Sequence, residues 1–334
     1  MIHAMAKTSI GIIGLGYWGP NLVRNFAAQE QAEVACICDV KEEHCRKFAL
    51  QYPSIRTTTN PENLWSDPTL DAIVIATPTA SHHSLAKSAL ESGKHVLLEK
   101  PITASSTEAR DLIHIAKKRE LILMVDHTFV YEDAVQTVKH YIDTGTLGEM
   151  LYFDSIRINL GLIRQDTNVL WDLAVHDLSI LTYLLPREEV TDIHAYGLSH
   201  YTKNIEDAHL HMTLSNGTAA HIHVSWLSPV KIRQTLIGGT EKMVLYNDNE
   251  PSEKIRLYNK GVDIKREEQS FALPVYRSGD VLIPHLKTIE PLKELARHFC
   301  ACIRGEEKPK TPGEDGLKVI EILEKADQSL TPSP

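Results

Sequence analysis

The chain has 334 residues, of which 43% are hydrophobic and 24% charged, with a formal net charge of −9. This composition is typical of a globular enzyme with room for two domains, and it excludes disordered and fibrous proteins. The acidic balance argues against nucleic-acid binding, which needs a surplus of Lys and Arg on one face, and no apolar run reaches the roughly 20 residues of a membrane span.

The first 126 residues alternate short β-rich runs with helical stretches. The runs lack an alternating polar face, which is typical of strands buried on both sides in a parallel sheet covered by helices. Strand–helix alternation also implies βαβ units with right-handed crossovers. We therefore predict a doubly wound α/β domain over residues 1–126, with strands at SIGII, EVACICD, DAIVIA, HVLLE and LILMVD.

A glycine-rich turn follows the first predicted strand. Gly14, Gly16 and Gly19 have the G-x-G-x-x-G spacing, in which glycines permit a tight turn, close approach to a pyrophosphate, and close packing of the next helix. Asp39 closes the next strand, where an acid binds the ribose hydroxyls and favours NAD over NADP. A flavodoxin-like sheet whose glycines only form turns is the alternative.

Two further segments follow predicted strands. Thr77, Pro78 and Thr79 come after DAIVIA, and Glu99-Lys100-Pro101 comes after HVLLE. Ligands of open α/β sheets bind just beyond the carboxyl ends of the strands, so we expect both segments near the nicotinamide end of a cofactor. The alternative for Lys100 is a solvated charge at the end of a strand.

The second half of the sequence has a different pattern. HTFVYEDAVQTVKHYIDTG predicts one amphipathic helix that Gly145 closes. Successive strands without intervening helices then predict a mostly antiparallel sheet, followed by the helical segments EPLKELARHFCACIRG and EDGLKVIEILEKADQSL. We therefore assign residues 127–334 to an α+β domain.

Four histidines flank the turn dipeptide Asn216-Gly217. A two-residue turn would pair His211 with Ile222 and Met212 with His221. Directly paired residues share a face, so this register would place the two histidine pairs on opposite faces of the sheet. We therefore expect no metal site from His209, His211, His221 and His223.

The five cysteines have neither metal-binding nor redox spacing. The N-terminal residues also lack the long apolar core of a secretion signal. These features predict reduced packing cysteines in a cytoplasmic protein.

The stretch VLWDLAVHDLSIL carries Asp172 and His176 in an apolar setting. Four residues make about one helical turn, so both side chains would lie on one face. That face is either solvated or lines a site where a proton moves. Asp177 points elsewhere on the helix, and we expect it to be structural.

The chain resembles the Gfo/Idh/MocA oxidoreductases, which act mostly on sugars, inositols and nucleotide sugars. The resemblance covers nearly the whole chain and rests on GLGYWGPNL, ATPTASHH, EKP, DHTFVYEDAV, NVLWDLAVHDLSIL and GEDGLKVIEILEKA. It implies a Rossmann domain followed by an open-faced sheet domain, with the active site in the cleft between them. An open sheet exposes an apolar face that monomers rarely leave uncovered, so we expect face-to-face packing into homodimers or homotetramers through the sheet.

Residue roles follow from this resemblance. Lys100 matches the catalytic lysine, followed by a cis peptide to Pro101, and Asp172 and His176 match the acid and the base. Val175 stands where close relatives usually have proline. In the matching motifs, the residues that would bind NAD are Gly14, Gly16, Tyr17, Trp18, Gly19, Asp39, Thr77, Pro78, Thr79, His82, Glu99, Lys100 and Pro101.

The segments HTFVYEDAV and RINLGLIRQDTNVLWDLA resemble the nucleotide-sugar branch of this family. That branch includes UDP-N-acetylglucosaminuronate dehydrogenases of polysaccharide biosynthesis. The expected substrate contacts are Lys100, Tyr131, Arg157, Asn159, Arg164, Asn168, Asp172 and His176. Two alternatives are an NAD-dependent glycosidase that uses transient oxidation and a non-catalytic dinucleotide sensor. The intact Lys100, Asp172 and His176 count against a sensor.

Overall fold

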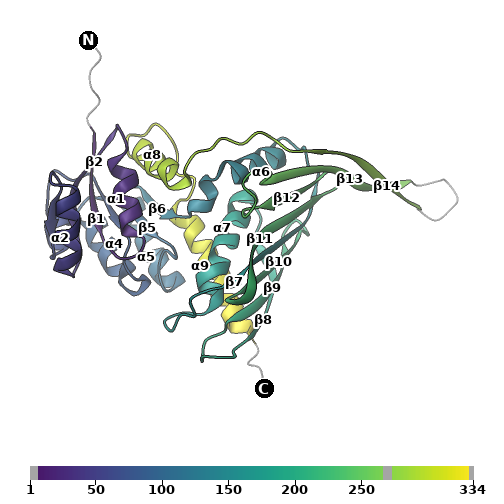
Figure 1. Cartoon of the computed structure of the whole chain (residues 1–334), viewed down its shortest axis with the longest axis horizontal. Coiled ribbons are helices and arrows are strands. Elements are labelled where there is room, and N and C mark those ends of the chain that lie inside the picture. Colours follow the sequence, from purple (N-terminus) through teal and green to yellow (C-terminus); the bar gives the residue numbers. More distant parts are fainter. Residues whose placement is uncertain (1–6, 266–272, 331–334) are drawn as a thin grey trace, which may run out of the picture. The chain divides into compact units, whose positions relative to one another are not determined.

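The computed structural model describes residues 7–265 and 273–330 and divides into two compact units. The first unit runs to Glu132 and includes Ile289–Glu321, and the second comprises Asp133–Thr288 and the chain from Ile322. The boundary therefore lies after residue 132 instead of 126, and one C-terminal segment returns to the first unit. Each unit has its own β-sheet (Figure 1).

The first unit is built on a six-stranded sheet in the order β3-β2-β1-β4-β5-β6, in which every pair is parallel. This order is that of a Rossmann fold and confirms the predicted doubly wound domain. The short strand β3 was not predicted. The strands are β1 (Thr8–Ile13), β2 (Ala32–Cys38), β3 (Arg56–Thr58), β4 (Ala72–Ile75), β5 (His95–Glu99) and β6 (Leu123–Asp126).

Helices cover this sheet. The central strands β1 and β4 have almost wholly buried side chains, as expected when both faces are covered. The helices are α1 (Gly19–Ala27), α2 (Glu42–Gln51), α3 (Glu62–Trp65), α4 (His82–Glu91) and α5 (Ser106–Lys118), with the 3₁₀ turns η1 (Thr79–Ser81) and η2 (Thr128–Tyr131).

The helix α8 (Pro291–Ile303) packs against α1 in this unit. Phe299 meets Phe26 edge-to-face with ring centroids 6.3 Å apart, and Glu290 accepts two hydrogen bonds from Arg24. These contacts explain why Ile289–Glu321 belongs to the first unit, although the sequence analysis assigned it to the second domain. Contacts between segments so distant in sequence leave no local pattern.

The second unit contains an eight-stranded sheet in the order β14-β13-β12-β11-β7-β10-β9-β8. All neighbours are antiparallel except β7 and β10, which confirms the mostly antiparallel prediction. The edge strand β14 was not predicted. The strands are β7 (Met150–Leu160), β8 (Val190–Leu198), β9 (Asp207–Leu214), β10 (Ala219–Ser225), β11 (Leu227–Gly239), β12 (Met243–Asn247), β13 (Ile255–Lys265) and β14 (Leu273–Leu282).

One face of this sheet is covered by helices, as the ribbon shows (Figure 1). Along β9, Ala208, Leu210 and Met212 are buried, whereas the alternate side chains are exposed. Among the described residues, no helix lies on that second face, which we call the uncovered face. The helical elements are α6 (Asp133–Asp143), the π-helical turn η3 (Leu170–Ala174), α7 (Val175–Leu184) and the end of α9 (Gly313–Ser329).

The single helix predicted from residue 127 to Gly145 is wrong in its first part. The chain forms η2, passes Glu132 in an extended conformation, and then begins α6. Because the unit boundary also falls after Glu132, the break separates a turn of the first unit from a helix of the second. Gly145 has a φ of 71° and follows the end of α6, as expected of a C-terminal glycine.

The predicted register of the β9–β10 hairpin is also wrong. Leu214 donates its N–H to the carbonyl of Thr218, so the loop has three residues and ends at Gly217, which has a φ of 85°. This loop places His211 directly opposite His221 and His209 opposite His223. A one-residue shift moves every side chain of a strand to the other face, so all four histidines lie on the uncovered face.

All five cysteines are free and buried, which confirms the prediction of packing residues. Burial raises the pKa of the Cys38 thiol to about 12 and that of Cys300 to about 11. Among the described residues, no helix combines the length and apolar character that crossing a membrane demands.

Candidate active site

The glycine loop between β1 and α1 has the close packing that its spacing predicts. A Cβ atom on Gly19 would lie 1.9 Å from the carbonyl oxygen of Gly14, and one on Gly14 would lie 2.5 Å from that of Ala76. By contrast, a Cβ on Gly16 would meet nothing within 4 Å. Gly14 and Gly19 therefore permit the loop conformation, whereas Gly16 leaves open space beside the backbone.

Asp39 follows β2 and faces this loop. Its carboxylate accepts hydrogen bonds from the backbone N–H groups of Leu15 (2.7 Å) and Lys41 (2.8 Å), and His44 Nδ1 lies 3.1 Å from it. Burial alone would raise the pKa of Asp39, but these contacts outweigh it and lower the pKa. Asp39 is therefore ionised at neutral pH, and its lone pairs can accept further bonds from ribose hydroxyls.

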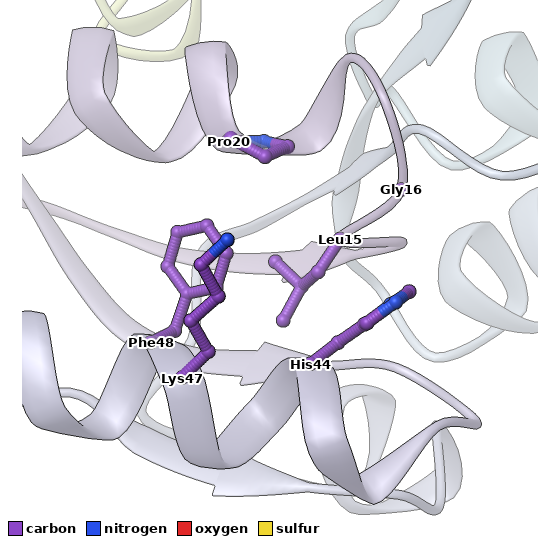
Figure 2. A pocket seen from close by; sticks show the side chains of 6 residues that line it. All are labelled: Leu15, Gly16, Pro20, His44, Lys47 and Phe48. Carbon is purple, nitrogen blue, oxygen red and sulfur yellow. The ribbon is translucent and has the colours of Figure 1, made fainter.

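A pocket of about 200 Å³ lies between the glycine loop and α2 (Figure 2). His44 and Lys47 extend from α2 toward the loop and the start of α1 (Figure 2). The volume is below the roughly 300–1,000 Å³ of complete ligand sites, so the pocket fits one end of a longer ligand. Its lining residues are Leu15, Gly16, Pro20, His44, Lys47 and Phe48.

His82 contacts the loop after β4. This side chain is completely buried, and its ring nitrogens lie 2.9 Å from the carbonyl oxygens of Thr77 and Pro101. A neutral imidazole has one N–H and can donate to only one of the two. We therefore assign His82 a positioning role for the two loops that were predicted to meet the cofactor.

The Glu99-Lys100-Pro101 segment follows β5, and its Lys100–Pro101 peptide is cis, as the resemblance implied. Glu99 accepts a hydrogen bond from the Lys100 backbone N–H at 2.9 Å. Burial first, and then the neighbouring Asp126 carboxylate, raise the pKa of Glu99 well above its usual range. A protonated Glu99 can donate to Asp126, which also accepts from Trp18 Nε1 at 3.0 Å.

His127 lies near Lys100 and was not predicted as a site residue. Its side chain is buried, and neither ring nitrogen has a hydrogen-bond partner in the described part of the chain. Burial, and to a smaller extent the Lys100 charge, lower the pKa of His127 to about 3. Buried polar atoms normally have partners, so this ring has bonding capacity for a polar group of a ligand.

These features together fit a dinucleotide. The open space at Gly16, the ionised Asp39 and the start of α1 form a cradle for a pyrophosphate and its ribose. Lys100 and the unsatisfied His127 lie at the carboxyl ends of β5 and β6, where the rest of such a ligand extends.

In the second unit, Asp172 lies in the π-helical turn η3, and His176 follows in the first turn of α7. The expected continuous α-helix is therefore wrong in its first turn. π-helical turns are frequent at functional sites. Asp172 accepts hydrogen bonds from Trp226 Nε1 (3.0 Å) and from Arg164 (3.3 Å), so its carboxylate is held before any substrate arrives.

Asn168 has a structural role that the sequence analysis did not predict. Its side-chain oxygen accepts from the backbone N–H groups of Leu170 (3.0 Å) and Trp171 (3.2 Å), and its amide donates to Asp327. These bonds cap the helix that carries Asp172, because the first N–H groups of a helix lack partners within it. Asn168 therefore positions the site.

Arg157 was predicted as a substrate contact, but the structure places it in a buried ion pair. Its side chain lies against α7, where Nε and a terminal nitrogen bind both carboxylate oxygens of Asp177 at 2.8 and 3.0 Å. Ser155 also donates to Asp177, which confirms the structural role expected of that residue. The pair ties β7 to α7.

Tyr131 is likewise buried inside the first unit. Its hydroxyl lies 3.0 Å from His298 Nδ1 and 3.2 Å from Thr311 Oγ1. These contacts hold the Tyr131 hydroxyl within the first unit, and a substrate contact by Tyr131 stays a prediction. Asn159 lies beside Gly161 and Trp226, whose indole binds Asp172, so it stays a candidate.

The first unit thus places Asp39 at the glycine loop and Glu99 beside Lys100, and the second gathers Arg164, Asp172 and Trp226. Sequence analysis missed His127 and Trp226 because the burial of one ring and the bond of the other to Asp172 depend on tertiary packing and leave no local pattern. Tyr17 projects from the glycine loop with 94% of its surface exposed.

Comparison with known proteins gives the following matches. Residues 8–127 match the family described as oxidoreductase family, NAD-binding Rossmann fold, and residues 135–245 match the GFO/IDH/MocA C-terminal domain. UDP-N-acetylglucosamine 3-dehydrogenase of Acidithiobacillus ferrooxidans is 33% identical over 67% of this chain and 68% of that protein. A solved structure of it has a TM-score of 0.83 and 26% identity over 98% of each chain. The NAD⁺-dependent scyllo-inositol 2-dehydrogenase of Bacillus subtilis is 24% identical over 96% of this chain and 93% of that protein.

Proposed function

The chain belongs to the Gfo/Idh/MocA family of oxidoreductases, and from that premise we propose that it oxidises a secondary hydroxyl group of a sugar or nucleotide sugar with NAD. The observation that carries the proposal is the position of Lys100. It follows β5 at the carboxyl edge of the sheet, where open α/β sheets bind their ligands, near a buried His127 whose ring nitrogens have no hydrogen-bond partner among the described residues.

The reaction removes a hydride from carbon and a proton from oxygen. Bound NAD supplies the hydride acceptor. His176 takes the hydroxyl proton, because an imidazole titrates near neutral pH. Lys100 donates a hydrogen bond to the reacting oxygen and stabilises its negative charge. Asp172, held by Trp226 and Arg164, accepts a hydrogen bond that orients the substrate hydroxyl or the imidazole.

Arg164 supports a nucleotide sugar as the substrate. Its guanidinium is 40% exposed and is shared between Asp172 and Asp166, which is itself 65% exposed. A diphosphate or carboxylate can replace Asp166 as the partner of Arg164, since guanidinium groups bind such anions in a bidentate manner. The relative that uses UDP-N-acetylglucosamine agrees with this substrate class.

A substrate screen tests the proposal. The purified chain is mixed with NAD and, in turn, UDP-sugars with and without a sugar carboxylate, inositols and free hexoses, and NADH absorbance is recorded. We expect NADH with a UDP-sugar, and in the Arg164→Gln variant a KM about tenfold higher for that substrate. No NADH from any compound contradicts the proposal. Cleavage of a glycosidic bond without NADH would instead indicate the glycosidase with transient oxidation.

We also propose that the uncovered face of the sheet packs against a second copy of the chain. Ile156 and Leu236 are 38% and 46% exposed there, and an apolar surface of this kind usually marks an interface. Self-association through one face gives a dimer, and a second contact gives a tetramer. Light scattering should show such an assembly, and Leu236→Lys should weaken it; a wild-type monomer would contradict it.

We place this reaction in the cytoplasm. The five buried thiols fit a reducing compartment, because burial keeps them protonated and unreactive. Cell fractionation tests the location, and recovery of the protein outside the cytoplasm would contradict it.

A further inference from the structure

Two histidines face each other across strands β9 and β10 on the uncovered face. His209 and His223 are direct partners in the strand register, so their side chains leave the sheet side by side. The two rings are stacked, with centroids 4.0 Å apart and planes 10° apart. The arrangement exists because the hairpin loop has three residues, which shifts the register from the one that the Asn-Gly dipeptide predicted.

Asp207 adds a carboxylate to this pair. It lies two residues before His209, on the same face of β9, and its oxygens are 3.8 Å from His209 Nε2 and 3.5 Å from His223 Nε2. Both distances are longer than a good hydrogen bond. Two atoms bound at about 2.0–2.1 Å to one tetrahedral Zn²⁺ lie about 3.3 Å apart, which is close to these separations. One ligand atom from each residue lies within 4.8 Å of the other two.

We propose that Asp207, His209 and His223 bind a divalent transition-metal ion of the Zn²⁺ class. Two imidazole nitrogens and one carboxylate oxygen suit Zn²⁺, Ni²⁺ or Cu²⁺, whereas Mg²⁺ and Ca²⁺ prefer all-oxygen sites. The single carboxylate offsets part of the charge of the ion. In the single chain, His209, His223 and Asp207 are 47%, 28% and 27% exposed, so an ion can reach them from solvent before the proposed self-association and water can complete its coordination.

The neighbouring histidine pair provides a matched control. His211 and His221 lie on the same two strands and the same face, but their rings meet edge-on at 64° with centroids 4.9 Å apart. His221 Nδ1 is held by Asp154 at 2.8 Å. This second pair has the same residue types and a similar exposure without a carboxylate placed to bridge both rings.

The full chain is prepared without a polyhistidine tag and stripped of metal with a chelator. It is then titrated with ZnCl₂ in a calorimeter. We expect one Zn²⁺ per chain, tighter binding of Cu²⁺, and no binding of Mg²⁺. His209→Gln and His223→Gln should each weaken Zn²⁺ binding at least about tenfold. His211→Gln should leave the affinity unchanged.

A thermal measurement keeps the test independent of activity and of folding defects. Zn²⁺ should raise the Tm of the wild type and of His211→Gln by about 5 °C at a hundredfold excess over Kd, and should not raise that of His209→Gln. The variants should share one Tm without metal, because the side chains are exposed. Absence of Zn²⁺ binding by the wild type, or wild-type affinity in His209→Gln, would overturn the proposal. Equal weakening by His211→Gln would also overturn it, since binding would then be nonspecific.

Discussion

In the first unit the backbone positions the candidate site, whereas in the second unit pairs of polar side chains do so. The glycine loop closes because Gly14 and Gly19 leave no room for a Cβ, and Asp39 is held by backbone N–H groups. In the second unit, Asp172 is held by Trp226 and Arg164, and Arg157 pairs with Asp177 beneath the same helix.

This difference determines how each half should respond to substitution. A backbone site fails through steric conflict, because carbonyl oxygens of neighbouring strands cannot move aside. A site built from side-chain pairs fails when one partner is left buried without the other. The following predictions, in order of expected effect, test whether the two units differ in this way.

The largest effect is expected at the buried ion pair. Arg157→Met leaves the Asp177 carboxylate buried without its cation, which should lower the free energy of unfolding of the second unit by about 3–5 kcal/mol. The double variant Arg157→Met, Asp177→Leu should recover most of that loss, because no charge is left buried. Chemical denaturation monitored by circular dichroism measures both. A loss below about 1 kcal/mol in the single variant would contradict this role.

Steric conflict in the glycine loop should come next. Gly19→Ala places a Cβ 1.9 Å from a carbonyl oxygen, so we expect a loss of about 2–3 kcal/mol in stability and weaker NAD binding. Gly16→Ala is the matched control: its Cβ meets nothing within 4 Å, so stability should be kept while NAD binding falls. Equal Tm values for the two variants would show that the loop does not depend on close packing.

The buried groups near Lys100 predict opposite pH dependences. The pKa of His127 is lowered from 6.5 to about 3. Its contribution to the free energy of unfolding is therefore complete above pH 6.5 and is lost as the pH falls toward 3. By pH 5 the loss should be about 2 kcal/mol. Glu99 has a raised pKa, so its contribution is complete below its unfolded value near 4.5 and is lost as the pH rises.

Two variants separate these contributions. Between pH 5 and 6.5, Glu99→Gln keeps only the His127 effect, and its stability should rise with pH. His127→Asn keeps only the Glu99 effect, and its stability should fall over the same range. Urea unfolding at several pH values measures how the free energy of unfolding of each variant changes with pH. Changes of the same sign in both variants would refute the opposite pKa shifts of His127 and Glu99.

The smallest effect is expected at Trp226. Trp226→Phe removes the N–H that binds Asp172, which should lower kcat/KM about tenfold. Trp171→Phe is the control, because the indole of Trp171 donates to Asp327 instead. Steady-state kinetics compares the two, and an equal loss in both would mean that the bond to Asp172 has no special role.

The sequence predicts the first unit better than the second for a physical reason. Glycine spacing, strand–helix alternation and Asp39 depend on local geometry, so Gly14, Gly16 and Gly19 could be placed correctly. The buried contacts of Arg157 with Asp177 and of Tyr131 with His298 could not be predicted, because the partners are distant in sequence. A charge or a hydroxyl in a sequence does not reveal whether a second buried group will satisfy it.

Errors of register have the same origin. The Asn216-Gly217 dipeptide predicts a two-residue turn, yet the loop takes three residues. With β9 and β10 paired in this way, Leu210, Met212 and Ile222 lie buried on the helix-covered face. The packing of the sheet therefore decides the register, and that packing depends on strands and helices that a dipeptide rule does not include.

The most direct test of the account is turnover and NAD affinity of Lys100→Met, measured on the same preparation with the substrate found in the screen. The account predicts that turnover falls at least about 100-fold while the Kd for NAD stays nearly unchanged, because the ammonium stabilises the reacting oxygen. Turnover close to that of the wild type would contradict it.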